Sequence, residues 1–192
     1  MNKKFTTTQI VGTGLLLALE IVFQIIGNYL QFGPVNINLS LVTIVMAAVL
    51  YGPLSGAILG FFNGIMALFS PSTLAIFMPI SPIGTVIVCL LKTTLAGVLS
   101  GLVFNLLKNK NKIIGLVLAS LIVPIVNTGI FIALSFVFFR PFLESGTEAY
   151  PNLGAFVIFG LIGWNFVFEI LTTVILSLPL GVIIFKRNGE TK

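Results

Sequence analysis

The sequence contains no histidine and no aspartate, and it has a single cysteine among its 192 residues. Histidine-dependent hydrolysis, histidine zinc sites and magnesium sites built from several carboxylates need residue types that are missing or scarce here. Cys89 alone excludes both a disulfide within the chain and a CxxC redox or metal site. No GxxxxGK[ST] phosphate-binding loop is present either. We therefore expect no enzyme, metal site or cofactor, and any associated ATP hydrolysis must belong to another chain.

Charge is also scarce. Charged residues make up 8% of the chain, hydrophobic residues make up 57%, and the mean hydropathy is +1.16. These values lie outside the range of soluble globular domains. The sequence therefore predicts an all-α integral membrane protein, with residues 1–192 forming a single transmembrane domain.

The number of membrane spans follows from the apolar runs, because a spanning helix needs about 20 apolar residues. The runs cover residues 8–30, 39–69, 83–107, 113–139 and 154–185. As one helix the second run would be about 46 Å long, well beyond a hydrocarbon core of about 30 Å. Gly52 and Pro53 supply a break within it, since proline cannot continue a helix from the preceding turn. The expectation is six transmembrane helices, two of them short.

The distribution of lysine and arginine predicts the orientation, because short cytoplasmic loops are enriched in both. Six spans with cytoplasmic N- and C-termini leave only Arg140 outside, beside Glu144 and Glu148. Five spans would place the lysine cluster at residues 108–112 on the opposite side of the membrane from the lysines near the N-terminus. The residues then placed inside are Lys3, Lys4, Lys108, Lys110, Lys112, Lys186, Arg187 and Lys192.

Three longer connections are expected on the outer side, at residues 32–38, 70–82 and 140–153. The middle one has three prolines, yet it is apolar at its centre. Such a segment is too hydrophobic for a solvated linker. Two interpretations are open: it folds down over a cavity, or it lies on the membrane surface.

Three ionisable residues fall within the expected spans: Glu20, Lys92 and Glu169. Ionisable groups at membrane depth are costly and usually face the interior of a bundle, so each is a candidate functional residue. Lys92 lies too deep for its ammonium to reach the interface easily. Its partner is either one of the two glutamates, in a structural ion pair, or the carboxylate of a bound ligand.

Further polar residues extend this set of candidates. Gln24 and Asn28 follow Glu20 at four-residue spacing and form a stripe on the first span, where they either line a cavity or bond to neighbouring helices. Asn165 and Glu169 share a face of the last span. The other candidates, each with helix packing or a place at the membrane interface as its alternative, are Asn63, Asn127 and Trp164.

Small residues indicate two packing surfaces. Gly52, Gly56, Gly60 and Gly64 form a ridge that favours close packing inside the bundle. Gly14 and Ala18 lie on a different side of the first span from its polar stripe, where they suit the docking of another helix, from this chain or from a partner. Together with the polar groups on several spans, this pattern predicts an outward-facing pocket for a small organic molecule.

The chain resembles the S component, the substrate-binding subunit, of energy-coupling factor (ECF) vitamin transporters, from about residue 8 to residue 186. The stretches that carry the resemblance are diffuse, and Gly14 stands where the family often has alanine. They are residues 14–18, Asn36-Ile37-Asn38-Leu39-Ser40, Leu50-Tyr51-Gly52-Pro53-Leu54-Ser55-Gly56, residues 60–63 and residues 92–97.

The resemblance implies an S-component-like bundle in a bacterial cell membrane that binds a vitamin tightly from outside. It also implies a membrane coupling protein docked on the small-residue face of the first helix and two cytoplasmic ATPases. The overall pattern is most similar to the pantothenate type, in which Lys92 or Arg140 would take the carboxylate and Gln24, Asn127 and Asn165 the polar remainder. Riboflavin, pyridoxine and a stand-alone secondary transporter remain alternatives.

Overall fold

The fold is that of a computed structural model, which describes residues 6–29, 31–32, 35–36 and 38–187. The elements follow one another in chain order and are almost all helical. They are α1 (Thr7–Asn28), β1 (Gln31–Phe32), β2 (Val35–Asn36), α2 (Leu41–Tyr51), α3 (Pro53–Leu68), the π-helical η1 (Thr73–Phe77), α4 (Met78–Ile80), α5 (Pro82–Leu107), α6 (Lys112–Phe138), α7 (Arg140–Gly146), α8 (Leu153–Ala155), the π-helical η2 (Phe156–Ile162) and α9 (Gly163–Arg187).

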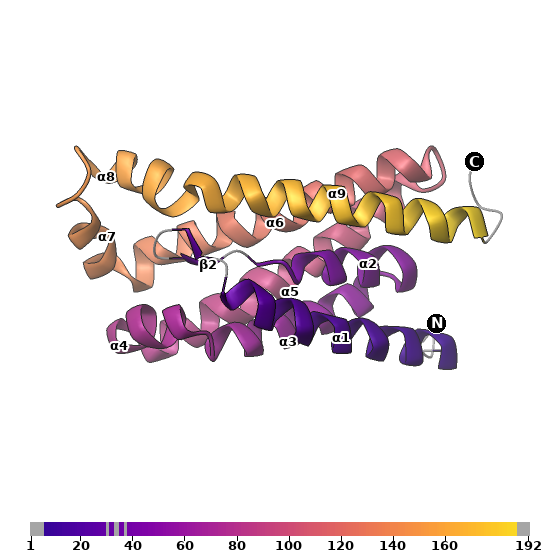
Figure 1. The fold of residues 1–192 in the computed structure, drawn as a ribbon, viewed down its shortest axis with the longest axis horizontal. Helices are drawn as coiled ribbons and strands as arrows, with labels where there is room; N and C mark the ends of the chain where they lie inside the picture. The colour runs from indigo at the N-terminus through magenta and orange to yellow at the C-terminus, as the bar shows by residue number, and fades with distance from the viewer. Residues whose placement is uncertain (1–5, 30, 33–34, 37, 188–192) are drawn as a thin grey trace.

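The long helices run roughly side by side in an elongated bundle (Figure 1). The first turn of α1, the last turn of α9 and the loop between α5 and α6 lie at one end, at the right of the picture. The short helices α4, α7 and α8 lie at the other end. Strands β1 and β2 form a two-residue antiparallel hairpin between α1 and α2. Two of the three connections that the sequence predicts to be long, at residues 70–82 and 140–153, therefore share one end of the molecule.

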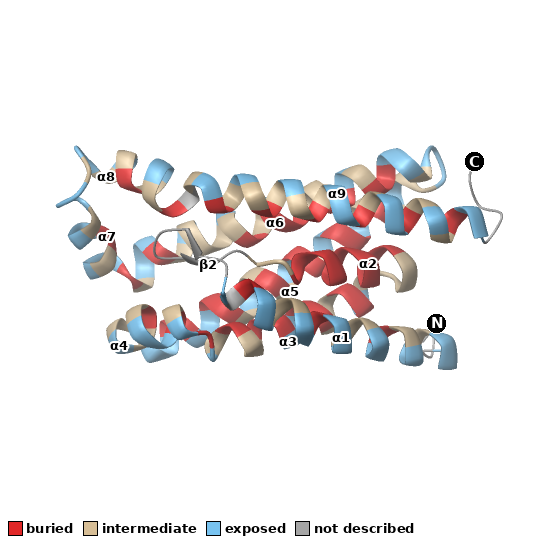
Figure 2. Ribbon diagram, viewed as in Figure 1, coloured by how far each residue is buried: buried red, intermediate tan, exposed pale blue. Residues whose placement is uncertain are grey.

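The predicted break between the second and third helices occurs at Gly52. Its φ of 100° belongs to a region that favours glycine, and Pro53 follows in the first turn of α3, where a missing amide costs nothing. Helix α2 is enclosed by its neighbours: every residue from Leu41 to Val49 is buried (Figure 2). The main apolar core forms around it.

Helices α3 and α5 approach each other along the glycine ridge. A Cβ added at Gly56 would lie 2.6 Å from the carbonyl oxygen of Gly97, and one at Gly64 would lie 2.6 Å from the carbonyl oxygen of Cys89. Both values are well inside ordinary van der Waals contact. The ridge therefore acts in internal packing, which brings α5 with Lys92 close to α3 with Asn63.

By length and composition, four helical segments of the described chain can cross a membrane: α1, α5, α6 and the stretch from Leu153 to Arg187. A fifth span results if α3 is taken together with Thr73–Ile80, to which it is bent by 65°. Helix α2 is apolar but has only 11 residues, or about 16 Å. The structure thus has a helix in each of the six predicted runs, but α2, and α3 when taken without the bent segment, are shorter than a full span.

The predicted outer connection at residues 70–82 is largely helical. Residues 73–80 form η1 and α4, and Phe77 of this segment is 5% exposed. The Phe77 ring packs against Phe131, Phe139 and Phe142, with centroid distances of 5.5, 4.9 and 5.1 Å. This segment therefore packs onto the bundle through an aromatic cluster.

Candidate functional site

A cavity lies between α5, α6, α9 and the segment that contains η1. Its aromatic wall includes Phe77, Phe131 and Phe139. Its polar wall gathers side chains from helices that are far apart in the sequence and from the segment before α2. These residues, which we call the polar wall, are Gln24, Asn38, Lys92, Asn127, Asn165 and Glu169.

Lys92 supplies the positive charge of this cavity. It lies about 15 Å along α5 from Pro82, and its ammonium is 5.3 Å from the centroid of the Phe131 ring. No carboxylate oxygen of a described residue lies within 4 Å of this ammonium. Glu169, on α9, also belongs to the polar wall and attracts the ammonium electrostatically without forming a direct ion pair. The cation is therefore available to an anionic group that enters the cavity.

Glu169 is 4% exposed and is held by donors from two other parts of the chain. The backbone N–H of Asn38 donates to its Oε1 at 3.1 Å, and the Thr128 hydroxyl donates to its Oε2 at 3.5 Å. The Asn127 side chain is a further hydrogen-bond partner of this carboxylate. These bonds join α6, α9 and the segment before α2 around the cavity.

A second hydrogen-bond cluster joins the same segment to α1 and α3. The Asn38 amide donates to Asn63 Oδ1 at 3.0 Å, and the Asn63 amide donates to the Ser40 hydroxyl. Ser40 in turn donates to Gln24 Oε1 at 3.0 Å. Asn38 thus belongs to both networks, because its backbone contacts the cavity carboxylate and its side chain contacts this cluster.

Glu20 lies at the far side of the second cluster and is fully buried. The Thr43 hydroxyl donates to its Oε2 at 3.4 Å, and Asn63 is its other hydrogen-bond partner. Glu20 does not line the cavity, whereas Gln24, one turn further along α1, does. Of the two glutamates considered as partners of Lys92, Glu169 is therefore the one that shares its cavity.

The structure brings five of the predicted binding residues together in the polar wall: Gln24, Lys92, Asn127, Asn165 and Glu169. Asn63 is fully buried just behind it, bonded to Asn38. The side chain of Asn28 lies outside the described part of the chain. Trp164 is 70% exposed on α9, so it does not line the cavity.

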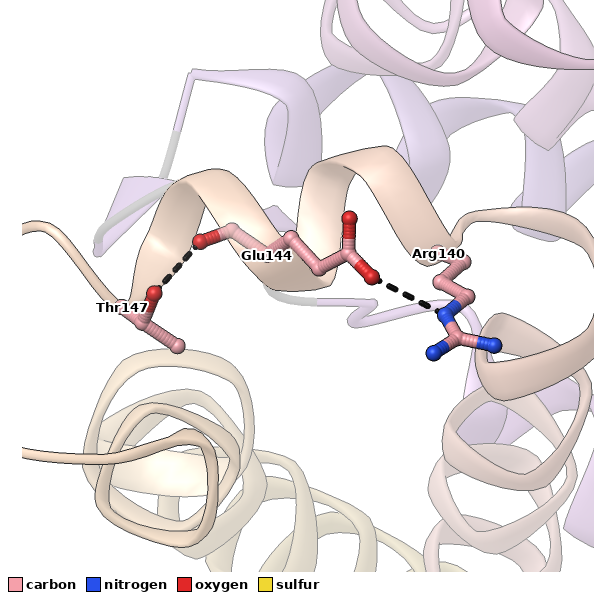
Figure 3. Close-up of polar contacts among 3 residues, drawn as sticks. All are labelled: Arg140, Glu144 and Thr147. Atoms are coloured by element: carbon pink, nitrogen blue, oxygen red, sulfur yellow. Dashed lines mark hydrogen bonds and ion pairs between the residues drawn. The ribbon is translucent and has the colours of Figure 1, made fainter.

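Arg140 also lies away from the cavity, at the start of α7. Its Nε donates to Glu144 Oε1 at 2.9 Å, and the two side chains are 79% and 65% exposed (Figure 3). The Thr147 hydroxyl donates to the backbone carbonyl of Glu144 at the end of the same helix (Figure 3). Of the two predicted partners for a ligand carboxylate, only Lys92 faces the cavity.

Gly14 and Ala18, predicted as a docking face, are both exposed on α1. A Cβ added at Gly14 would meet no atom within 4 Å. Only 17% of the membrane-spanning window of α1 is buried within the bundle. The small-residue face of α1 is therefore open to a neighbouring molecule or to lipid.

Three contributors to the site are not among the predicted binding residues: Asn38, Thr128 and Phe77. Asn38 lies in a connection rather than in an apolar run, and Phe77 is one of 18 phenylalanines. Thr128 holds Glu169 only because α9 packs beside α6, and the sequence around Thr128 does not specify that packing.

Within the described residues, no group of three or more His, Cys, Asp or Glu side chains gathers to hold a metal ion.

Comparison with known proteins identifies the family. A family model described as "ECF transporter, substrate-specific component" matches residues 8–181, which is most of the chain and includes the whole polar wall. Neither curated proteins nor solved structures give a match. The matched range contains α2, α3, α5 and α6 in full, nearly all of α1, and α9 as far as residue 181. The chain therefore belongs to the family of substrate-specific components of ECF transporters.

Proposed function

We propose that this substrate-specific subunit captures pantothenate in its cavity, with Lys92 holding the carboxylate and the amides of the polar wall holding the rest. As a member of its family it is a binding subunit of a transporter, and ATP hydrolysis belongs to separate partner chains. We also propose the identity of the substrate, the residues that bind it, the orientation of the helices and the location of the protein in a bacterial cell membrane.

The observation that carries the proposal is the Lys92 ammonium, which lines the cavity and has no carboxylate oxygen of a described residue within 4 Å. An ammonium at membrane depth is costly unless it is paired. Pantothenate has a carboxylate at one end, and a charge-assisted hydrogen bond to the ammonium would stabilise the bound state. Its amide and two hydroxyls would find partners among Gln24, Asn127 and Asn165, while its two methyl groups suit the aromatic wall.

Six membrane spans with both termini in the cytoplasm are part of this proposal. Lys108, Lys110 and Lys112 lie in or beside the loop at the same end of the bundle as Lys186 and Arg187, which supports a cytoplasmic location for that end (Figure 1). Helix α2 is shorter than the hydrocarbon core. Its enclosure by other helices supports its role as a span. A helix may end within the membrane when protein rather than lipid surrounds its terminal backbone groups.

The open face of α1 supports the docking of a transmembrane coupling protein on Gly14 and Ala18. Small residues allow two helix backbones to approach closely in a membrane, where packing rather than hydrophobicity drives association. The coupling protein would link this subunit to two cytoplasmic ATPase subunits. The polar wall belongs mainly to α5, α6 and α9, so the docking face and the cavity are formed largely by different helices.

The direct test is calorimetric titration of the purified full chain in detergent with pantothenate, riboflavin and pyridoxine. We expect saturable one-to-one binding of pantothenate alone. Saturable binding of riboflavin or pyridoxine instead would contradict the proposed substrate and leave the family assignment intact. Calorimetry is preferable to tryptophan emission here, because the exposed Trp164 lies outside the cavity.

Uptake of pantothenate by cells distinguishes the subunit from a stand-alone secondary transporter. In cells that express this chain, uptake should cease when the partner ATPases are deleted. Cells with the ATPases and without this chain serve as the control. Full uptake in the absence of the ATPases would favour a secondary transporter.

A further inference from the structure

The cavity wall contains a buried hydrogen-bond acceptor that the described part of the chain leaves without a donor. Asn127 lines the cavity and is 4% exposed. Its Oδ1 is fully buried, and no donor from the described residues reaches it. An unsatisfied buried carbonyl is costly, and native proteins rarely tolerate one without a reason. Because Asn127 lines the cavity, a ligand donor that reaches this oxygen when the cavity is filled would remove this cost.

The neighbouring carboxylate fixes which end of the Asn127 amide is free. A carboxylate accepts hydrogen bonds, so the group that Asn127 turns toward Glu169 is its NH₂. Glu169 is held in turn by the backbone N–H of Asn38, which donates to it at 3.1 Å, and by the Thr128 hydroxyl, which donates at 3.5 Å. Because Glu169 is held from two sides, it prevents the Asn127 side chain from exchanging its oxygen and nitrogen.

We propose that Asn127 is a specificity-determining residue whose Oδ1 accepts a hydroxyl or N–H of the substrate, and that Glu169 is the positioning residue that keeps this oxygen free. The inference rests on the acid-binding function proposed above and narrows its substrate class. The substrate carries an anionic group for Lys92 on α5 and a hydrogen-bond donor for Asn127 on α6. An acid without such a donor leaves the buried oxygen unsatisfied and binds more weakly.

The substrate pair that tests this is pantothenate and its analogue with both hydroxyls replaced by hydrogen, titrated by calorimetry into the full chain. A site with a buried acceptor rejects a ligand that lacks the donor, so the wild type should prefer pantothenate by at least about tenfold. In Asn127→Leu the preference should fall to about twofold or less. Asn105→Leu changes an amide that bonds Lys108 far from the cavity, and it should retain the full preference.

A pair of variants gives a test without ligand. Leucine at position 127 removes the amide donor to Glu169 as well as the unsatisfied carbonyl, so the comparison is made in the Glu169→Leu background, where that donor has no acceptor. There the second substitution removes an unpaired amide, and the empty double variant should melt at or above the temperature of Glu169→Leu. A merely structural asparagine would instead give a clear fall in melting temperature. A fall of that kind, or an undiminished preference for pantothenate in Asn127→Leu, would overturn the inference.

Glu169 is tested through the ligand preference rather than through affinity alone. Glu169→Leu removes the acceptor for the Asn127 NH₂ and should abolish the preference for the hydroxylated acid, while Glu169→Gln keeps one acceptor oxygen and should retain part of it. An equal loss of affinity for both ligands in both variants, with the preference unchanged, would contradict a positioning role. If the wild type binds no pantothenate at all, the substrate proposal fails, and the melting temperatures of the empty variants still decide whether Asn127 Oδ1 is unsatisfied.

Discussion

The contact between α3 and α5 gives the sharpest stability prediction, through the substitution Gly60→Ala. A Cβ at position 60 would lie against the carbonyl group of Thr93, and the Cα of Thr94 would be 2.9 Å away. These are backbone atoms of α5, so no side-chain rotation relieves the overlap. Ordinary contact begins at 3.4 Å, and 3.4 − 2.9 gives a required shift of about 0.5 Å from Thr94 alone. The two helices must therefore move apart.

The cost of this movement follows from the density of packed protein interiors. Overpacking by one methyl group typically costs about 1–3 kcal/mol, which for a chain of this length lowers the melting temperature by about 2–12 °C. Lys92 directly precedes Thr93 on α5, so the same displacement moves its ammonium relative to Phe131 and the polar wall. Affinity for pantothenate should therefore fall together with stability.

Thermal unfolding in detergent, followed by circular dichroism, measures the first effect, and calorimetric titration measures the second. Gly14→Ala is the matched control, because it gains the same helix propensity of about 1 kcal/mol and its Cβ meets no atom within 4 Å. The control should melt at or slightly above the wild-type temperature. Equal melting temperatures for Gly60→Ala and Gly14→Ala would refute the close α3–α5 packing.

Three further predictions concern other surfaces of the molecule. Gly14→Leu and Ala18→Leu should leave pantothenate affinity unchanged and prevent co-purification with the coupling protein, since both positions are exposed on α1; equal loss of both properties would indicate internal packing instead. Arg140→Ala should lower the melting temperature by no more than about 4 °C, because an exposed ion pair contributes at most about 1 kcal/mol, and ligand affinity should be unchanged. Weaker binding of the acid would return Arg140 to the site. Glu20→Leu should melt at or above the wild-type temperature, because Thr43 and Asn63 both keep Ser40 as an acceptor and the cost of burying a carboxyl group is removed. A fall of more than a few degrees would show that Glu20 stabilises the fold.

Much of the fold could be predicted from local features of the sequence. The break at Gly52 and Pro53 followed from backbone geometry, and the packing of the glycine ridge followed from the absence of side chains. The sequence predicted that α2 is short, but it did not predict that the other helices would bury it. Its near-complete burial depends on the arrangement of the surrounding helices, which no local pattern specifies.

The polar wall was predictable where a polar residue interrupts an apolar helix, as at Lys92, Asn127 and Glu169. Prediction was poorer where the role depends on rotation about a helix axis or on a connecting segment. Trp164 precedes Asn165 by one residue, or about 100° around α9, and this rotation leaves it 70% exposed. Asn38 joins the two hydrogen-bond networks through contacts with residues 25 and 131 positions away, which sequence spacing does not reveal.

The most direct test of the whole account is the charge on Lys92, measured with an acid and its neutral analogue. Calorimetry should compare pantothenate with pantothenol, in which a primary alcohol replaces the carboxylate, for the wild type, Lys92→Met and the loop control Lys110→Met. We predict that Lys92→Met loses at least about tenfold in affinity for pantothenate, since a hydrogen-bonded charge pair is worth about 1.5–3 kcal/mol, and that its affinity for pantothenol changes little. The Lys110→Met control should match the wild type with both ligands. Undiminished pantothenate binding by a folded Lys92→Met protein would contradict the central claim that this cavity recognises an acid through Lys92.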